Sequence, residues 1–412
     1  MKRFFIKKYI FAALFLIVIF AGGIANGIYE FEAVKDVFHK YGHITNKEDL
    51  NKFVARMETG MNDSMLGKMQ FIEGYGYIQK ILGKSEINNF SYVKDKNGYL
   101  HYSGFYRESD KNISEYAKRV RRLQESVKSK GTKVIFVSPP GKYMSDFSEF
   151  DQGFPVNKGS KERDELLIAL HENGVQTLDL QNSMMQSGLS YDDMFFKTDH
   201  HWKPQAAFYS FTQLVETLDR KFGMQLDPEN YYTDINNYHI REYQQCMLGS
   251  MGANTGINYA GLDDFTFIWP KCDMEFKWEA EDQKGVPRGG EGKIENSLLQ
   301  LKFLVTDDPY NNQQYSVYLN GVSPVDHIEN KSNETGLKVL CIRDSFFSPV
   351  ALFLAPMFRE MDMVWPLASY NKKDVESFLN KNRYDLIIIE LYPYNINEEA
   401  FPYFKESTIK SK

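Results

Sequence analysis

Short apolar runs that alternate with amphipathic segments are the feature that most constrains the fold of this chain. Buried strands are predicted at "KVIFVSPP" (133–140), "VQTLDL" (175–180), "LKVLCI" (337–342), "MDMVWP" (361–366) and "YDLIIIEL" (384–391). Around these runs apolar residues recur at helical spacing, and Gly131, Gly174 and Gly223 stand where three of the helices should end. Strands that alternate with helices predict an α/β fold with a mostly parallel sheet and helices on both faces.

The alternation is interrupted between residues 224 and 335, where the composition changes. This region is rich in Tyr, Asn, Gly and Asp, and the runs "LLQLKFLV" (298–305) and "YSVYLNG" (315–321) favour short strands. We therefore expect a β-rich insertion in one α/β domain. The first part of that domain would be residues 91–223 and the second part residues 336–412.

Residues 1–29 are predicted to be a membrane anchor or a signal segment. Four basic residues lie within the first eight, and the run from Tyr9 to Tyr29 carries no charge. Such a run reaches the roughly 20 residues that span a bilayer, and the basic cluster should stay in the cytoplasm. We expect an uncleaved single-pass anchor in the cell membrane, with the rest of the chain outside the cytoplasm. The small residues of "AGGIA" leave cleavage and secretion as the alternative. Residues 30–90 are predicted to form a stalk or helical neck.

The charge and the cysteine content exclude two classes of protein. The 412 residues have a formal net charge of −6 with interspersed signs, and no basic patch indicates a nucleic-acid partner. Three cysteines are too few for a disulfide-built scaffold. In an oxidising compartment Cys246 and Cys272 could still pair, whereas Cys341 ends an apolar run and is expected to be a buried thiol.

Two polar stretches, "FFKTDHHWKP" (195–204) and "IRDSFF" (342–347), follow predicted strands. Ligands of parallel sheets bind beyond the carboxyl ends of the strands, so both stretches should border a site. Ser345 lies in a tight strand-to-helix connection, as a nucleophilic serine requires. His201 would take the proton of Ser345, and Asp199 would orient and stabilise the imidazole.

Other roles stay open for the same residues. Asp199, His200 and His201 could bind a metal ion, although the other six histidines are scattered without ligand spacing. Asp-x-His stretches can also be hydrogen-bonded loop residues. His200 is expected to be structural or to contact the substrate. Because adjacent residues rarely point at one ion without ligands from elsewhere in the chain, we expect no metal at this site.

Three further residues near strand ends are candidate substrate contacts, each with a structural alternative. Lys142 follows the run at 133–140 and could face either the cleft or solvent. Trp202 could stack on a sugar or pack in the core. Arg343 could position an acidic sugar or neutralise Asp344.

"KTDHHW" together with "IRDSFF" resembles the DHHW proteins, relatives of the SGNH-hydrolase-like O-acetyltransferases of the alginate acetylation type. In that family a T-D-x-H-W stretch carries the Asp and the His, and a later D-S stretch carries the serine. These positions match Asp199, His201 and Ser345, and the resemblance covers most of residues 91–396. It implies an SGNH-like three-layer sandwich in which the motif order is circularly permuted.

The same resemblance implies an extracytoplasmic O-acetyltransferase that acts on a cell-surface or secreted polysaccharide through an acetyl-serine intermediate. Acetyl-CoA is not expected outside the cell. A multi-spanning membrane O-acyltransferase would therefore be the partner that delivers the acetyl group, and no metal or organic cofactor is implied. The alternatives are an O-acetyl esterase with the same residues and a non-catalytic polysaccharide-binding or scaffold protein.

The sequence departs from the family pattern around the serine. Arg343 and Asp344 stand where these acetyltransferases often have a glycine. Pro356 falls inside the helix predicted after the serine and should kink it. No oxyanion-hole segment can be transferred from the family, so Asn320 and Gly321 are the candidates.

Overall fold

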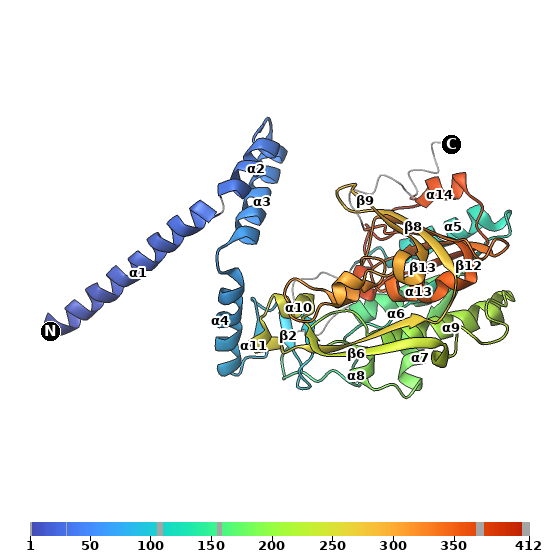
Figure 1. The fold of residues 1–412 in the computed structure, drawn as a ribbon, viewed down its shortest axis with the longest axis horizontal. Coiled ribbons are helices and arrows are strands. Elements are labelled where there is room, and N and C mark those ends of the chain that lie inside the picture. The colour runs from blue at the N-terminus through green and yellow to red at the C-terminus, as the bar shows by residue number, and fades with distance from the viewer. Residues whose placement is uncertain (1, 30, 105–109, 155–158, 368–374, 406–412) are drawn as a thin grey trace. The chain divides into compact units, whose positions relative to one another are not determined.

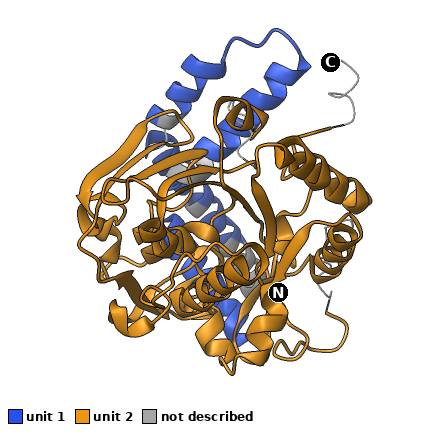
Figure 2. Ribbon diagram, turned by 90° about the vertical axis from the view of Figure 1, so that its right-hand side faces the viewer, with its two compact units in different colours: residues 1–82 blue, residues 83–412 orange. Residues whose placement is uncertain are grey.

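The computed structural model describes residues 2–29, 31–104, 110–154, 159–367 and 375–405, which belong to two compact units, residues 1–82 and 83–412 (Figure 2). The first unit is helical, with α1 (Lys2–Tyr29), α2 (Phe31–Tyr41), α3 (Lys47–Ser64) and α4 (Lys68–Ile81). Ala12–Tyr29 within α1 is apolar and long enough to cross a membrane. The helices end at Ile81, before the end of the predicted neck over residues 30–90, and residues 86–87 already pair with residues 92–93 as strands of the second unit.

An eight-stranded sheet is the centre of the second unit (Figure 1). Its order is β5 (Gln176–Asp179), β4 (Lys133–Ser138), β13 (Leu386–Glu390), β11 (Leu337–Arg343), β12 (Phe358–Val364), β10 (Val325–Asn330), β8 (Glu275–Glu281) and β9 (Pro287–Lys293). The strands from β5 to β12 pair in parallel, and β10, β8 and β9 extend the sheet in antiparallel pairing. The five parallel strands are the five apolar runs of the sequence.

Helices cover both faces of this sheet, because alternate residues of each buried strand point to opposite sides. In β13, Leu386 and Ile388 join one core, whereas Ile387 and Ile389 join the other. The first core also contains residues of α7 (Leu180–Gln186), α9 (Pro204–Phe222) and α13 (Phe347–Leu354). The second contains residues of α5 (Ile113–Lys128), α6 (Gly159–Glu172) and α14 (Val375–Lys381). The predicted three-layer α/β fold is confirmed.

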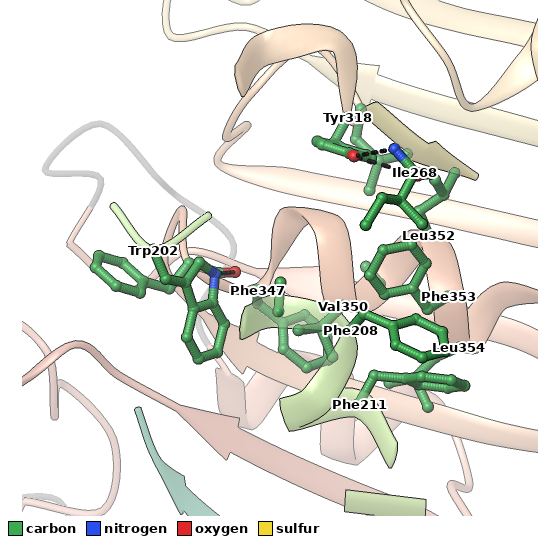
Figure 3. Close-up of a cluster of buried hydrophobic side chains, with 14 of the residues drawn as sticks. Trp202, Phe208, Phe211, Ile268, Tyr318, Phe347, Val350, Leu352, Phe353 and Leu354 are labelled. Carbon is green, nitrogen blue, oxygen red and sulfur yellow. Dashed lines mark hydrogen bonds between the residues drawn. The ribbon is translucent and has the colours of Figure 1, made fainter. Parts of the chain in front are cut away.

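Aromatic side chains pack α9 against α13 in the first core (Figure 3). Phe353 of α13 contacts Phe208 and Phe211 of α9, with ring centroids 5.5 and 5.7 Å apart. The two helices therefore form one rigid support. This support matters for function because α9 begins directly after the "DHHW" stretch and α13 begins directly after Ser345.

Residues 224–335, predicted as a β-rich insertion, contain five strands, and three of them belong to the main sheet. Strands β8, β9 and β10 complete the main sheet, and β6 (Tyr238–Met247) pairs with β7 (Asp263–Pro270). The strands predicted at 298–305 and 315–321 are wrong, since these stretches contain the 3-10 helices η2 (Leu301–Leu304) and η3 (Gln314–Val317). Leu319, Asn320 and Gly321 have φ values of 54°, 56° and 80°, and this left-handed run turns the chain where a strand would continue straight.

Short elements complete the second unit. They are β1 (Glu86–Ile87), β2 (Tyr92–Lys94), β3 (Leu100–Tyr102), α8 (Tyr191–Met194), η1 (Ile235–Asn237), α10 (Ser250–Ala253), α11 (Ile257–Ala260), α12 (Ile294–Ser297), η4 (Ala355–Met357) and η5 (Pro393–Asn395). Pro356 lies in η4, past the end of α13, so the predicted kink inside that helix is wrong. Cys246 and Cys272, for which the sequence left a disulfide open, are free thiols in this structure.

Candidate active site

Residues 195–203 form a closed loop that presents the acid and the two histidines. Phe195 pairs with Trp202 in an antiparallel bridge, which closes the loop just before α9. Inside the loop, the Asp199 carboxylate accepts the backbone N–H of His201 at 2.9 Å. Aspartate commonly makes such a bond to the backbone two residues on, and here it brings the His201 ring back over the carboxylate.

Ser345 lies in the turn between β11 and α13, and Asp344 holds this turn. The Asp344 carboxylate accepts the backbone N–H of Phe346 at 3.0 Å and that of Tyr392 at 2.6 Å. It also accepts the side-chain amide of Asn395 at 2.8 Å. The serine turn is thereby tied to the segment that follows the neighbouring strand β13.

The two stretches meet in a continuous hydrogen-bonded chain of three side chains. Nε2 of His201 lies 2.7 Å from Oγ of Ser345, and Nδ1 of His201 lies 2.6 Å from Oδ1 of Asp199. Ser345 is partly exposed, whereas Asp199 is buried. A hydroxyl, an imidazole and a carboxylate in this order can move the serine proton to the imidazole while the carboxylate stabilises the imidazolium.

Asp199 remains ionised although it is buried. Burial opposes its charge, but His200 and His201 and the hydrogen bonds from His201 outweigh this cost and hold its pKa well below the ordinary value. Its second oxygen, Oδ2, accepts the backbone N–H of Ser250 at 2.6 Å. An anion that is fixed on both oxygens suits the task of orienting His201.

Two residues far along the chain, Gly249 and Asp263, hold the 195–203 loop in place through hydrogen bonds. The buried carboxylate of Asp263 accepts the backbone N–H of Lys197 at 2.7 Å and both donors of Thr198, at 2.8 and 2.6 Å. Oγ1 of Thr198 in turn accepts the N–H of Gly249 at 2.8 Å. A Cβ on Gly249 would lie only 2.2 Å from Cβ of Asp199, so the backbone can approach this closely only at a glycine.

Lys142 is buried under the loop and does not face a cleft, so the prediction that it contacts substrate is wrong. Its Nζ donates to the backbone oxygens of Asp199, at 2.6 Å, and Lys197, at 3.1 Å. Burial lowers its pKa to about 7, partly opposed by Asp263, Asp199 and Asp95. Lys142 therefore positions the loop from inside the protein.

Replacing Lys142 with methionine should remove a pH dependence of stability. The folded-state pKa of about 7 lies below the ordinary lysine pKa of 10.5, so between these values the unfolded chain binds more protons. Wild-type stability should therefore gain up to about 1.4 kcal/mol per pH unit from this group as pH rises through that window. Urea unfolding of both proteins at pH 7, 8 and 9 measures the difference. Parallel pH profiles would contradict the assignment.

Trp202 and Tyr315 hold the His201 ring in place. The Tyr315 ring stacks on His201 with centroids 4.2 Å apart and an angle of 23°. Nε1 of Trp202 donates to the Tyr315 hydroxyl and to the backbone oxygen of Phe346, both at 3.1 Å. Trp202, labelled in Figure 3, is fully buried, so the prediction that it stacks on a sugar is wrong and its packing alternative holds.

Arg343 is also buried, and both roles predicted for it are wrong. Its side chain forms an ion pair with Asp326 of β10 inside the protein, away from Asp344. Arg343 is the last residue of β11 and is fully buried. It cannot reach an acidic sugar at the surface.

A pocket of about 270 Å³ opens beside Ser345, and its wall includes Asn320 and Gly321. The N–H of Gly321 donates to the backbone oxygen of Tyr318 at 3.0 Å. Because this donor is already used in a turn, the prediction of Gly321 as an oxyanion donor is wrong. Asn320 lines the pocket, so its predicted place beside the serine stays a prediction.

Asp199, His200 and His201 offer ligand atoms within 4.8 Å of one another, the spacing of a small metal site. However, both ring nitrogens of His201 are hydrogen-bonded to Asp199 and Ser345. A metal ion would have to displace these bonds. The geometry therefore favours the acid–base arrangement.

Several residues that shape the site were missed by the sequence interpretation. Gly249, Ser250, Asp263 and Tyr315 all contact the loop or its histidines. The glycines of "LGSMGANTG" were a usable signal, because clustered glycines mark close backbone approach. Asp263 and Tyr315 carried no local signal, since their contacts are made across long sequence separations.

Comparison with known proteins agrees with this architecture. Residues 93–248 match the family model described as the SGNH hydrolase-like domain of acetyltransferase AlgX, a match that contains Asp199 and His201 and ends before Ser345. The resemblance predicted from the motifs is confirmed. None of the curated proteins compared with this sequence matches it.

Two solved structures share the fold. Bacillus cereus PatB1 with a sulfonyl adduct is 18% identical, with a TM-score of 0.63 over 76% of this chain and 97% of that one. A DHHW family protein from Eubacterium siraeum is 17% identical, with a TM-score of 0.53 over 75% of this chain and 95% of that one. At these identities the similarity establishes the three-dimensional arrangement alone.

Proposed function

We propose that this chain, whose residues 93–248 match the model of the SGNH hydrolase-like domain of acetyltransferase AlgX, transfers acetyl groups to carbohydrate hydroxyls. The observation that carries the proposal is the chain of hydrogen bonds from Ser345 through His201 to Asp199 at the edge of a pocket. An enzyme that transfers acyl groups through a covalent intermediate needs this set of groups.

In the first half-reaction, Oγ of Ser345 attacks the carbonyl carbon of an acetyl donor while Nε2 of His201 takes the hydroxyl proton. The resulting oxyanion needs hydrogen-bond donors, and the side chain of Asn320 and the backbone N–H of Ser345 are the candidates beside the pocket. The tetrahedral intermediate collapses, the bond to the leaving group breaks, and His201 returns the proton to that group.

In the second half-reaction, His201 removes the proton of a sugar hydroxyl, and the sugar oxygen attacks the acetyl-Ser345 ester. Collapse releases the acetylated sugar, and His201 gives the proton back to Oγ of Ser345. Asp199 stabilises the imidazolium in both halves. This route requires no metal or organic cofactor.

The proposed location is the outer face of the cell membrane, with α1 as a single-pass anchor. The apolar segment Ala12–Tyr29 and the basic residues before it support this orientation. The acetyl donor would then be a multi-spanning membrane O-acyltransferase, and the acceptor a cell-surface or secreted polysaccharide.

The test is an assay of the full-length protein in detergent with p-nitrophenyl acetate as donor. We expect the mass of one acetyl group on the protein and faster nitrophenol release when oligosaccharide acceptors are added, with acetylated sugar as product. Acetyl adduct with hydrolysis alone, whatever the acceptor, would indicate an esterase. Absence of any adduct would favour the non-catalytic polysaccharide-binding alternative.

A further inference from the structure

His200 lies beside the reacting groups and has no part in the proton transfers described above. Its ring centroid is 3.9 Å from that of His201, and it lines the same pocket as Ser345. Its Nδ1 lies 3.2 Å from the Ser250 hydroxyl oxygen and 3.3 Å from Oδ1 of Asp199. These contacts fix the direction of the ring.

The state of this imidazole follows from its surroundings. Burial, followed by the neighbouring His201, lowers the pKa of His200 to about 3, so the ring is neutral at physiological pH. A neutral imidazole carries one N–H and one lone pair. Because Nδ1 faces a carboxylate oxygen and a hydroxyl, the hydrogen-bond network assigns the proton to Nδ1.

Nε2 of His200 therefore presents a lone pair away from Ser250 and Asp199. Among the described residues no group donates to this nitrogen, and 23% of the side chain is exposed. The centroids of the Tyr102 and Tyr392 rings lie 6.0 and 6.1 Å from that of the imidazole. A fixed acceptor on a partly exposed side chain that lines the pocket is suited to a hydroxyl donor.

We propose that Nε2 of His200 accepts a hydrogen bond from a second hydroxyl of the carbohydrate acceptor, next to the hydroxyl that His201 activates. The two imidazoles lie side by side, as neighbouring hydroxyls do on one sugar ring. Water offers no second hydroxyl, so this contact favours transfer to a polyol over hydrolysis. A site built to bind a substrate hydroxyl discriminates strongly against molecules that lack it. This assignment rests on the proposed acetyl transfer.

The test compares glycerol with 1-propanol, which has the same number of carbons and one hydroxyl, as acceptors for full-length protein in detergent with p-nitrophenyl acetate. Wild type should transfer acetyl to glycerol about tenfold better than to 1-propanol at equal concentration. His200→Asn keeps an amide near the Nδ1 position and removes the acceptor at Nε2, so it should lose this preference. His200→Gln places an amide oxygen near Nε2 and should retain most of it.

Intact mass of the same samples separates the two hypotheses. If wild type forms no acetyl adduct, the proposed function fails and the role of His200 fails with it. If the adduct forms, three results would each overturn only the role of His200. Wild type could show no preference for glycerol, or His200→Asn could keep the wild-type preference. The third is that His200→Gln loses the preference as completely as His200→Asn does. His171→Leu, an exposed histidine on α6, is the matched control and should keep the wild-type preference.

Discussion

Replacing Ser345 with alanine should abolish the acetyl adduct. It should also lower the enzyme-dependent rate of nitrophenol release by about four to six orders of magnitude. Oγ of Ser345 lies 2.7 Å from Nε2 of His201, and no other hydroxyl among the described residues has a hydrogen bond to that nitrogen. Without this oxygen there is no nucleophile to hold the acetyl group. Intact mass after brief exposure to p-nitrophenyl acetate measures the result directly.

The substitution is a clean probe because it removes one partly exposed oxygen and leaves the packing unchanged. We expect the free energy of unfolding to change by less than about 1 kcal/mol. Ser145→Ala, at an exposed serine of the same unit, should behave like wild type in every assay. An adduct of wild-type yield that persists in Ser345→Ala, or that maps to another residue, would contradict the assignment of Ser345.

Much of the parallel sheet could be predicted because its strands are local features of the sequence. The centre of "YDLIIIEL", residues 386–389, is an unbroken apolar run, as a strand buried on both faces requires, and β13 begins with it. The positions of Ser345 and the "DHHW" loop after predicted strands also placed both at one edge of the sheet. There, Nε2 of His201 is hydrogen-bonded to Oγ of Ser345. In both cases short-range pattern and topology were sufficient.

The other features depend on partners that are distant in sequence. β10 reads "VDHIEN" and looks polar, yet Asp326 is buried because Arg343 reaches it from β11. The sequence positions of Arg343 and Trp202 beside the two motifs predict contact with a sugar, but both side chains are fully buried in the fold. Likewise, Asp263 supports the loop from a strand more than sixty residues away. Such contacts follow from the assembled fold and leave no trace in local composition.

Gly249 is the missed position with the largest expected effect. A methyl group at this position would meet three atoms of Asp199, with Cβ at 2.2 Å, Cα at 2.6 Å and the backbone nitrogen at 2.7 Å. None of these atoms is the end of a flexible side chain, so Asp199 or the 249–250 backbone must move. The bond from Ser250 N–H to Asp199 and the bond from Gly249 N–H to Thr198 would both be disturbed.

Gly249→Ala should therefore lower the rate of acetyl-adduct formation by about a hundredfold, because a displacement near 1 Å in a catalytic group has that cost. Overpacking should also lower the free energy of unfolding by about 1–3 kcal/mol. Gly141→Ala adds the same methyl group to the same unit, but its nearest neighbour is 3.7 Å away, an ordinary contact. If the two variants form the acetyl adduct at comparable rates, the Asp199 loop adjusts to the added methyl group and the prediction is contradicted. A selective loss in Gly249→Ala would instead show that close backbone packing under Asp199 keeps His201 directed at Ser345.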